Sequence, residues 1–203
     1  MNRYVVVNWD YAEMLCRKVA MQILEDSFRP EKIVAVAKGG WFASMILSDY
    51  LGVEAISFDL KRKEEVSARS ILIVDDFINT GKTIKKVIEN VKANEIKTCA
   101  LLMLQASEFI PDYLGEYISE DVWVIFPWNF VEDLSAIILS TLEKCEQDYW
   151  GIKNAMFSEF KLDPLNLEIA QPSRLKEILY ILEKRKLVEK FEEADRIYWR
   201  LRR

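Results

Sequence analysis

The stretch that decides the fold reads Ile71-Leu72-Ile73-Val74-Asp75-Asp76-Phe77-Ile78-Asn79-Thr80-Gly81-Lys82-Thr83. Its apolar beginning is typical of a buried strand, and the strand ends at two adjacent acids, Asp75 and Asp76. A short polar turn then leads into a helix predicted over 82–92. The backbone N–H groups at the start of that helix, with the hydroxyls of Thr80 and Thr83, suit a phosphate dianion. The two carboxylates suit a polyhydroxyl group such as ribose, or a magnesium ion held through water.

Strands and helices are predicted to alternate on both sides of this stretch. Apolar runs predict strands at 33–37, 53–58, 71–74, 99–103 and 122–126, with helices at 9–27, 41–51 and 82–92. This alternation is typical of an α/β fold, a parallel twisted sheet flanked by helices on both faces. Ligands of such sheets bind at the carboxyl ends of the strands.

The alternation ends after residue 128. Helices are predicted at 131–147 and 173–186, followed by a hairpin formed by 187–191 and 196–201. The helix and hairpin together resemble part of a winged-helix domain. We therefore predict two domains, a core of residues 1–130 and a small, mainly helical appendage of residues 131–203.

Composition excludes several kinds of chemistry. The chain has 203 residues, a formal net charge of −5 and no histidine, so Ser-His-Asp machinery and His-ligated metal sites are ruled out. The acidic total argues against a dedicated nucleic-acid binder. Three cysteines without C-x-x-C spacing predict reduced, mostly buried thiols. We expect a cytoplasmic protein, because we find no secretory leader and no apolar stretch of the ~20 residues that a membrane span needs.

Two other interpretations of the opening stretch are less favoured. Gly81-Lys82-Thr83 resembles the end of a P-loop, but that motif needs a glycine five positions before Gly81, where this chain has Asp76. The second is a plain helix cap beside two solvated acids. Adjacent carboxylates at the end of an apolar strand repel each other, so without a ligand this arrangement carries a cost.

The stretch resembles the phosphoribosyl-pyrophosphate (PRPP) motif of the type I phosphoribosyltransferases: an apolar strand, two acids, two apolar residues and a Thr-Gly-x-Thr turn. About 36 residues upstream, Ala37-Lys38-Gly39-Gly40 is similar to the family's pyrophosphate-holding turn. Trp123-Val124-Ile125-Phe126-Pro127-Trp128 is similar to the purine-stacking segment of the bacterial and archaeal 6-oxopurine members. The resemblance covers roughly residues 1–130.

This resemblance implies roles for individual residues. The catalytic group would be Asp75, Asp76 and Asn79. The PRPP and phosphate group would comprise Lys38, Gly39, Gly40, Asp75, Asp76, Asn79, Thr80, Gly81, Lys82 and Thr83. The purine would contact Phe77, Trp123, Val124 and Ile125, and Lys61 and Arg62 would reach the diphosphate from a loop. Mg²⁺ would be held by PRPP, with Asp75 contributing through water, and no side chain would bind it directly.

Three departures from the family pattern matter, and the first two bear on the base. Asn79 stands where 6-oxopurine enzymes carry an Asp that accepts a proton, and Asn cannot take one. The Lys that those enzymes place near the purine oxo group is replaced by Leu104 or Gln105. The loop between Phe58 and Ile71 has only about 12 residues, whereas the family's mobile loop is long.

The missing Asp and the missing Lys favour adenine as the base. We expect a purine-salvage enzyme that transfers phosphoribosyl from PRPP to adenine, giving AMP and pyrophosphate. A 6-oxopurine enzyme is the alternative, and a non-catalytic PRPP- or nucleotide-sensing transcriptional regulator is the alternative from another class. A homodimer is expected, and neither a membrane nor DNA is expected as a partner.

Overall fold

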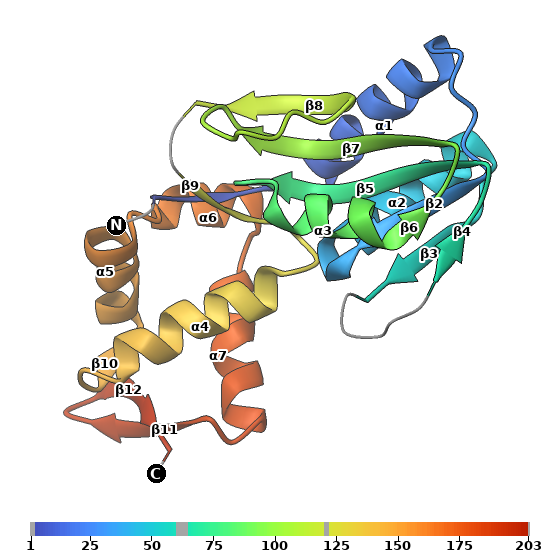
Figure 1. Ribbon diagram of the computed structural model, residues 1–203. Helices are drawn as coiled ribbons and strands as arrows, with labels where there is room; N and C mark the ends of the chain where they lie inside the picture. The colour runs from blue at the N-terminus through green and yellow to red at the C-terminus, as the bar shows by residue number, and fades with distance from the viewer. Residues whose placement is uncertain (1–2, 60–64, 120–121, 203) are drawn as a thin grey trace. The chain divides into compact units, whose positions relative to one another are not determined.

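The computed structural model describes residues 3–59, 65–119 and 122–202, and the chain forms two compact units (Figure 1). The sheet unit is Trp9–Asp121. The terminal unit combines Met1–Asn8 with Val122–Arg203. The observed division falls between residues 121 and 122, whereas the predicted boundary is at residue 130. Residues 1–8 also belong to the terminal unit, because the first strand pairs with the strand that begins at Val122.

The sheet unit is built on five parallel strands in the order β3-β2-β5-β7-β8. Their bounds are β2 Lys32–Val36, β3 Ala55–Phe58, β5 Ser70–Ile78, β7 Glu95–Leu104 and β8 Tyr113–Ile118. The apolar runs become the strands because a parallel sheet is buried on both faces. The predicted α/β class is confirmed.

Helices cover both faces of this sheet (Figure 1). They are α1 Trp9–Glu25, α2 Ala37–Leu51 and α3 Lys82–Asn90. Ile84 and Val87 of α3 pack against Ile71 and Ile73 of β5 in one buried cluster. Two short strands, β4 Val66–Ser67 and β6 Val91–Lys92, pair beside the main sheet.

Three details of the sheet unit differ from the sequence prediction. Helix α2 begins at Ala37 instead of residue 41, so the Lys38-Gly39-Gly40 turn is in fact the first turn of the helix. Strand β5 continues through the acidic pair to Ile78, because its backbone stays paired with the long strand β7. Strand β8 was not predicted.

The terminal unit begins with β1 (Arg3–Val6), which pairs in parallel with β9 (Val122–Ile125). Four helices follow: α4 Phe130–Leu142, α5 Tyr149–Phe160, α6 Pro164–Ala170 and α7 Arg174–Lys184. A three-stranded sheet in the order β10-β12-β11 completes it, with bounds β10 Gln147–Asp148, β11 Val188–Glu193 and β12 Arg196–Leu201. The predicted hairpin is confirmed, whereas α5 and α6 were missed and the helix predicted to end at 147 ends at Leu142.

The core of the terminal unit is formed by one apolar side of its helices. Leu134 and Ile138 of α4, with Ile178 and Leu182 of α7, are fully buried in it.

Within the described residues, no helix is long and apolar enough to cross a membrane. Cys16 and Cys99 are buried, and burial raises the pKa of both thiols. Cys145, by contrast, is exposed.

Candidate phosphate-binding site

The acidic pair lies at the carboxyl end of the central strand β5. Asp76 is buried, and its backbone N–H donates to Asp75 Oδ1 at 3.0 Å. Burial, and then the neighbouring charge of Asp76, raise the pKa of Asp75 well above its usual value of 3.8. Two buried carboxylates side by side are costly when both are ionised. A bound cation, or hydroxyl groups that donate hydrogen bonds to the carboxylates, would therefore reduce the repulsion within this pair.

The first turn of α2 fits against this pair because two of its residues are glycines. A Cβ added at Gly39 would lie 2.1 Å from Asp76 Oδ2, and one added at Gly40 would lie 2.3 Å from the Val74 carbonyl oxygen. Ala37, which opens this turn, has a φ of 51°, a left-handed conformation that is uncommon outside glycine. The backbone of the turn is thus held directly beside β5.

The turn between β5 and α3 forms the second wall of the site. Gly81 has a φ of 75° and precedes the first residue of α3, and a Cβ on it would lie 2.2 Å from Phe109 Cβ. The Lys82 N–H donates to Thr80 Oγ1 at 3.5 Å. The N–H groups of a first helical turn have no partners inside the helix, so they are available to an anion.

Three cavities lie along this edge of the sheet, and the smallest shares lining residues with each of the other two. The smallest, about 110 Å³, is lined by residues of the β5–α3 turn, including Asp75, Phe77 and Asn79. A second, about 400 Å³, is lined by both Lys38 and Thr83. The structure thus brings together the two predicted phosphate-binding segments.

The third cavity, of about 450 Å³, lies between the β5–α3 turn and the segment that follows β7. It is lined by Asn79, Thr80 and Lys82 on one side and by Leu104 and Gln105 on the other. Both positions at which the chain departs from 6-oxopurine enzymes therefore face the same cavity. Lys85 and Ser107 also line it. Sequence reasoning missed these two residues and Phe109. Ser107 and Phe109 were missed because no spacing links the segment after β7 to the motif, whereas Lys85 lies just beyond the motif in α3.

Other predicted site residues are not among those that line these three cavities. Trp123, Val124 and Ile125 belong to β9 of the terminal unit, where Trp123 is 46% exposed and the other two are buried. Trp128 is a core residue, because it is buried and stacks on Phe126 with ring centroids 4.8 Å apart. Lys61 and Arg62 lie outside the described residues.

The carboxylates fit a magnesium ion only in part. Among the described residues there is no cluster of three or more Cys, Asp or Glu side chains that could enclose a metal. The chain offers Asp75 and Asp76, and the remaining oxygens would come from a bound phosphate compound or from water, as is usual for Mg²⁺.

The acidic strand end, the glycine-based start of α2 and the β5–α3 turn lie at one edge of the sheet of an α/β domain. Residues 52–133 match the phosphoribosyl transferase domain, a range that runs past the sheet unit and includes β9. This match agrees with the motifs, which resemble those of the type I phosphoribosyltransferases.

Individual relatives agree with this assignment. A xanthine-guanine phosphoribosyltransferase of Vibrio vulnificus is 28% identical over 145 residues, which are 64% of this chain and 91% of that protein. The crystal structure of a purine phosphoribosyltransferase from Pyrococcus horikoshii has a TM-score of 0.53 and 28% identity, covering 62% of this chain and 93% of that one. A Helicobacter pylori xanthine-guanine-hypoxanthine phosphoribosyltransferase shares the fold, with a TM-score of 0.53 and 15% identity over 66% of this chain and 99% of its own.

Proposed function

We propose that this protein is a purine phosphoribosyltransferase, which joins the phosphoribosyl group of PRPP to a purine and releases pyrophosphate. The observation that carries the proposal is the convergence on one sheet edge of the acidic pair, the Gly39-Gly40 helix start and the Thr80–Thr83 turn. The family and its named purine-specific relatives support it.

Each part of the site has a physical task in this reaction. The Thr80–Thr83 turn would hold the 5′-phosphate through backbone N–H groups and hydroxyls, while Asp75 and Asp76 would hold the ribose hydroxyls. Lys38 and the first amides of α2 would stabilise the negative charge of the departing pyrophosphate. Mg²⁺ carried by PRPP would neutralise part of that charge, with Asp75 contributing through water. The acids would also favour the cationic character that develops on the ribose.

The relatives and the site point to different bases. The sequence predicted adenine, whereas the curated relatives are named for xanthine and guanine, which favours a 6-oxopurine. We therefore propose a 6-oxopurine as the first candidate. Adenine is the second candidate, because Leu104 and Gln105 line the cavity beside Asn79 where 6-oxopurine enzymes place a lysine near the oxo group. A glutamine amide both donates and accepts, which suits the amino group and ring nitrogen of adenine.

Turnover with PRPP, Mg²⁺ and each of adenine, hypoxanthine, guanine and xanthine tests both proposals. Nucleotide formation with any purine supports the enzyme, and the ranking of kcat/KM identifies the base. Asp76→Ala should abolish turnover, whereas Asp49→Ala, which removes an exposed acid of α2, should not. Tight nucleotide binding without turnover for every base would refute the enzyme and support a nucleotide sensor.

We expect the enzyme to act in the cytoplasm as a homodimer. The terminal unit is not expected to bind DNA. The hairpin of β11 and β12 carries Glu192, Glu193 and Asp195 at its turn, and these acids oppose a phosphate backbone.

A further inference from the structure

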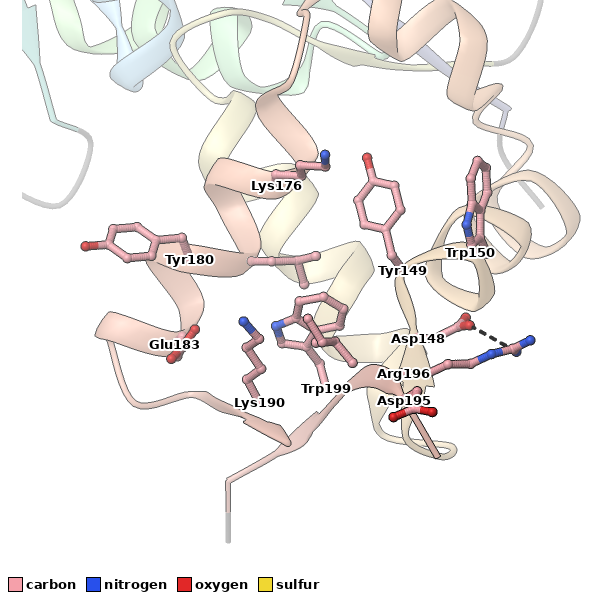
Figure 2. Close-up of a pocket in the computed structure, with 12 residues that line it drawn as sticks. Asp148, Tyr149, Trp150, Lys176, Tyr180, Glu183, Lys190, Asp195, Arg196 and Trp199 are labelled. Atoms are coloured by element: carbon pink, nitrogen blue, oxygen red, sulfur yellow. Dashed lines mark ion pairs between the residues drawn. The ribbon is translucent and has the colours of Figure 1, made fainter. Parts of the chain in front are cut away.

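The terminal unit contains a pocket of about 780 Å³ that is lined by none of the predicted transferase residues (Figure 2). It lies among the start of α5, the exposed side of α7 and the β11–β12 hairpin. Its apolar lining, which we call the aromatic pocket, consists of Tyr149, Trp150, Leu179, Tyr180, Ile197 and Trp199. Four aromatic rings from three elements therefore surround one cavity of the size that small-molecule sites have.

Much of this apolar lining is open to solvent. Trp150 is 67% exposed, Tyr180 59% and Ile197 42%. Large aromatic side chains gathered at a concave surface commonly mark a binding site, whereas scattered ones do not. The rings offer flat faces on which a planar molecule stacks.

A buried hydrogen-bond donor adds a second, independent indication. The indole Nε1 of Trp199 is shielded from solvent and has no hydrogen-bond partner among the described residues. Figure 2 shows this nitrogen turned toward the side of the pocket where Lys190 and Glu183 are drawn. A buried N–H without an acceptor is unfavourable. A ligand that displaces the side chain covering Nε1 and supplies an acceptor there gains affinity.

The charged groups of the lining balance one another. Three are positive and three negative: Lys176, Lys190 and Arg196 against Asp148, Glu183 and Asp195. Arg196 already pairs with Asp148, at 3.9 Å. The remaining groups supply both donors and acceptors with no net charge, an arrangement that suits a neutral polar ring and gives a phosphate no advantage.

We propose that the aromatic pocket binds an uncharged nucleobase or its nucleoside. Such a ligand has a flat π-face for the four rings, an acceptor nitrogen or oxygen for Trp199, and further polar atoms for Lys190 and Glu183. This proposal goes beyond the transferase function, because every lining residue belongs to the terminal unit while the phosphate site lies in the sheet unit.

Calorimetric titration of the full chain with adenosine and with guanosine tests the proposal, since a nucleoside lacks the phosphate that the other site holds. We expect one site per chain for at least one of them. Tyr180→Ala should weaken binding at least fivefold, given the usual worth of one base–aromatic stack. Trp199→Phe keeps a ring but removes the donor, and should weaken binding by about tenfold.

Matched variants separate this site from the transferase site. Phe157→Ala removes an equally exposed ring of α5 that does not line the pocket, and should leave nucleoside affinity unchanged. Asp76→Asn should also leave it unchanged, whatever it does to turnover, so the two proposals fail independently.

Four outcomes would overturn the proposal. The first is no binding of either nucleoside up to about 5 mM, a concentration that detects even weak affinity. The second is binding that disappears in Asp76→Asn and survives Tyr180→Ala. The third is more than fivefold tighter binding of AMP than of adenosine that Tyr180→Ala abolishes, which would refute the charge argument. The fourth is a change of oligomeric state in Tyr180→Ala without nucleoside binding, which would make the pocket a contact between copies.

Discussion

Replacing Gly39 by alanine perturbs the candidate site through a single methyl group. The added Cβ would lie 2.1 Å from Asp76 Oδ2, whereas real Cβ contacts under 3.0 Å are essentially never seen. Either the carboxylate or the first turn of α2 must therefore move by about 1 Å. Because a displacement of that size can cost on the order of 100-fold in rate, we expect Gly39→Ala to lose about 100-fold in kcat/KM. This corresponds to about 2.7 kcal/mol of transition-state stabilisation.

The assay is the initial rate of nucleotide formation with the preferred purine, with urea unfolding measured on the same preparation. Gly52→Ala is the matched control, because this glycine caps the other end of α2, has a φ of +65° and has nothing within 4 Å of its added Cβ. It should cost about 1 kcal/mol of stability and leave the rate unchanged. A folded Gly39→Ala protein with a rate within about threefold of the parent would refute the reasoning.

Three further predictions concern the same unit. Because the pKa of Asp75 is raised in the folded protein, this group stabilises the fold fully below about pH 3.8, and the stabilisation is lost as pH rises through the pKa in the folded protein. Asp75→Asn does not titrate, so its free energy of unfolding, measured by urea titration, should rise relative to that of the parent as pH increases from 3.8 to that pKa. Gly81→Ala forces a left-handed alanine against Phe109, and PRPP titration should show affinity lowered by about tenfold or more. Thr98→Val removes a hydroxyl that donates to Asp112 at 2.8 Å, and thermal unfolding should show a loss of about 1–2 kcal/mol, whereas an unchanged melting curve would contradict this.

The strands that the sequence predicted well are those buried on both faces. Residues 71–74 and 99–103 are continuous apolar runs, and both lie inside central strands of the sheet. Strand β8 was missed because Gly115 and Glu116 interrupt its apolar pattern. Gly115 stands there because a Cβ would lie 2.3 Å from the Leu101 carbonyl oxygen, a close approach that only the folded sheet reveals.

The candidate site was predictable where its parts are local in sequence. The acidic pair and the Thr80–Thr83 turn follow one strand, so one motif described both. That Lys38 and Thr83 line one cavity followed from the rule that parallel strands end at one edge. The contact of Phe109 with Gly81 joins residues that are distant in sequence and carry no pattern, so only the structure shows it.

The pairing of β1 with β9 has a consequence for how the protein is made. Tyr4 and Val6 pack against the helical core of the terminal unit, and Tyr4 meets Phe160 with ring centroids 6.0 Å apart. Tyr4 leaves the ribosome long before β9 is synthesised. At usual rates of translation, β1 therefore stays unpaired for on the order of 10 s while the sheet unit is made. Until then the early strand presents an open edge, which makes the nascent chain a natural client for chaperones.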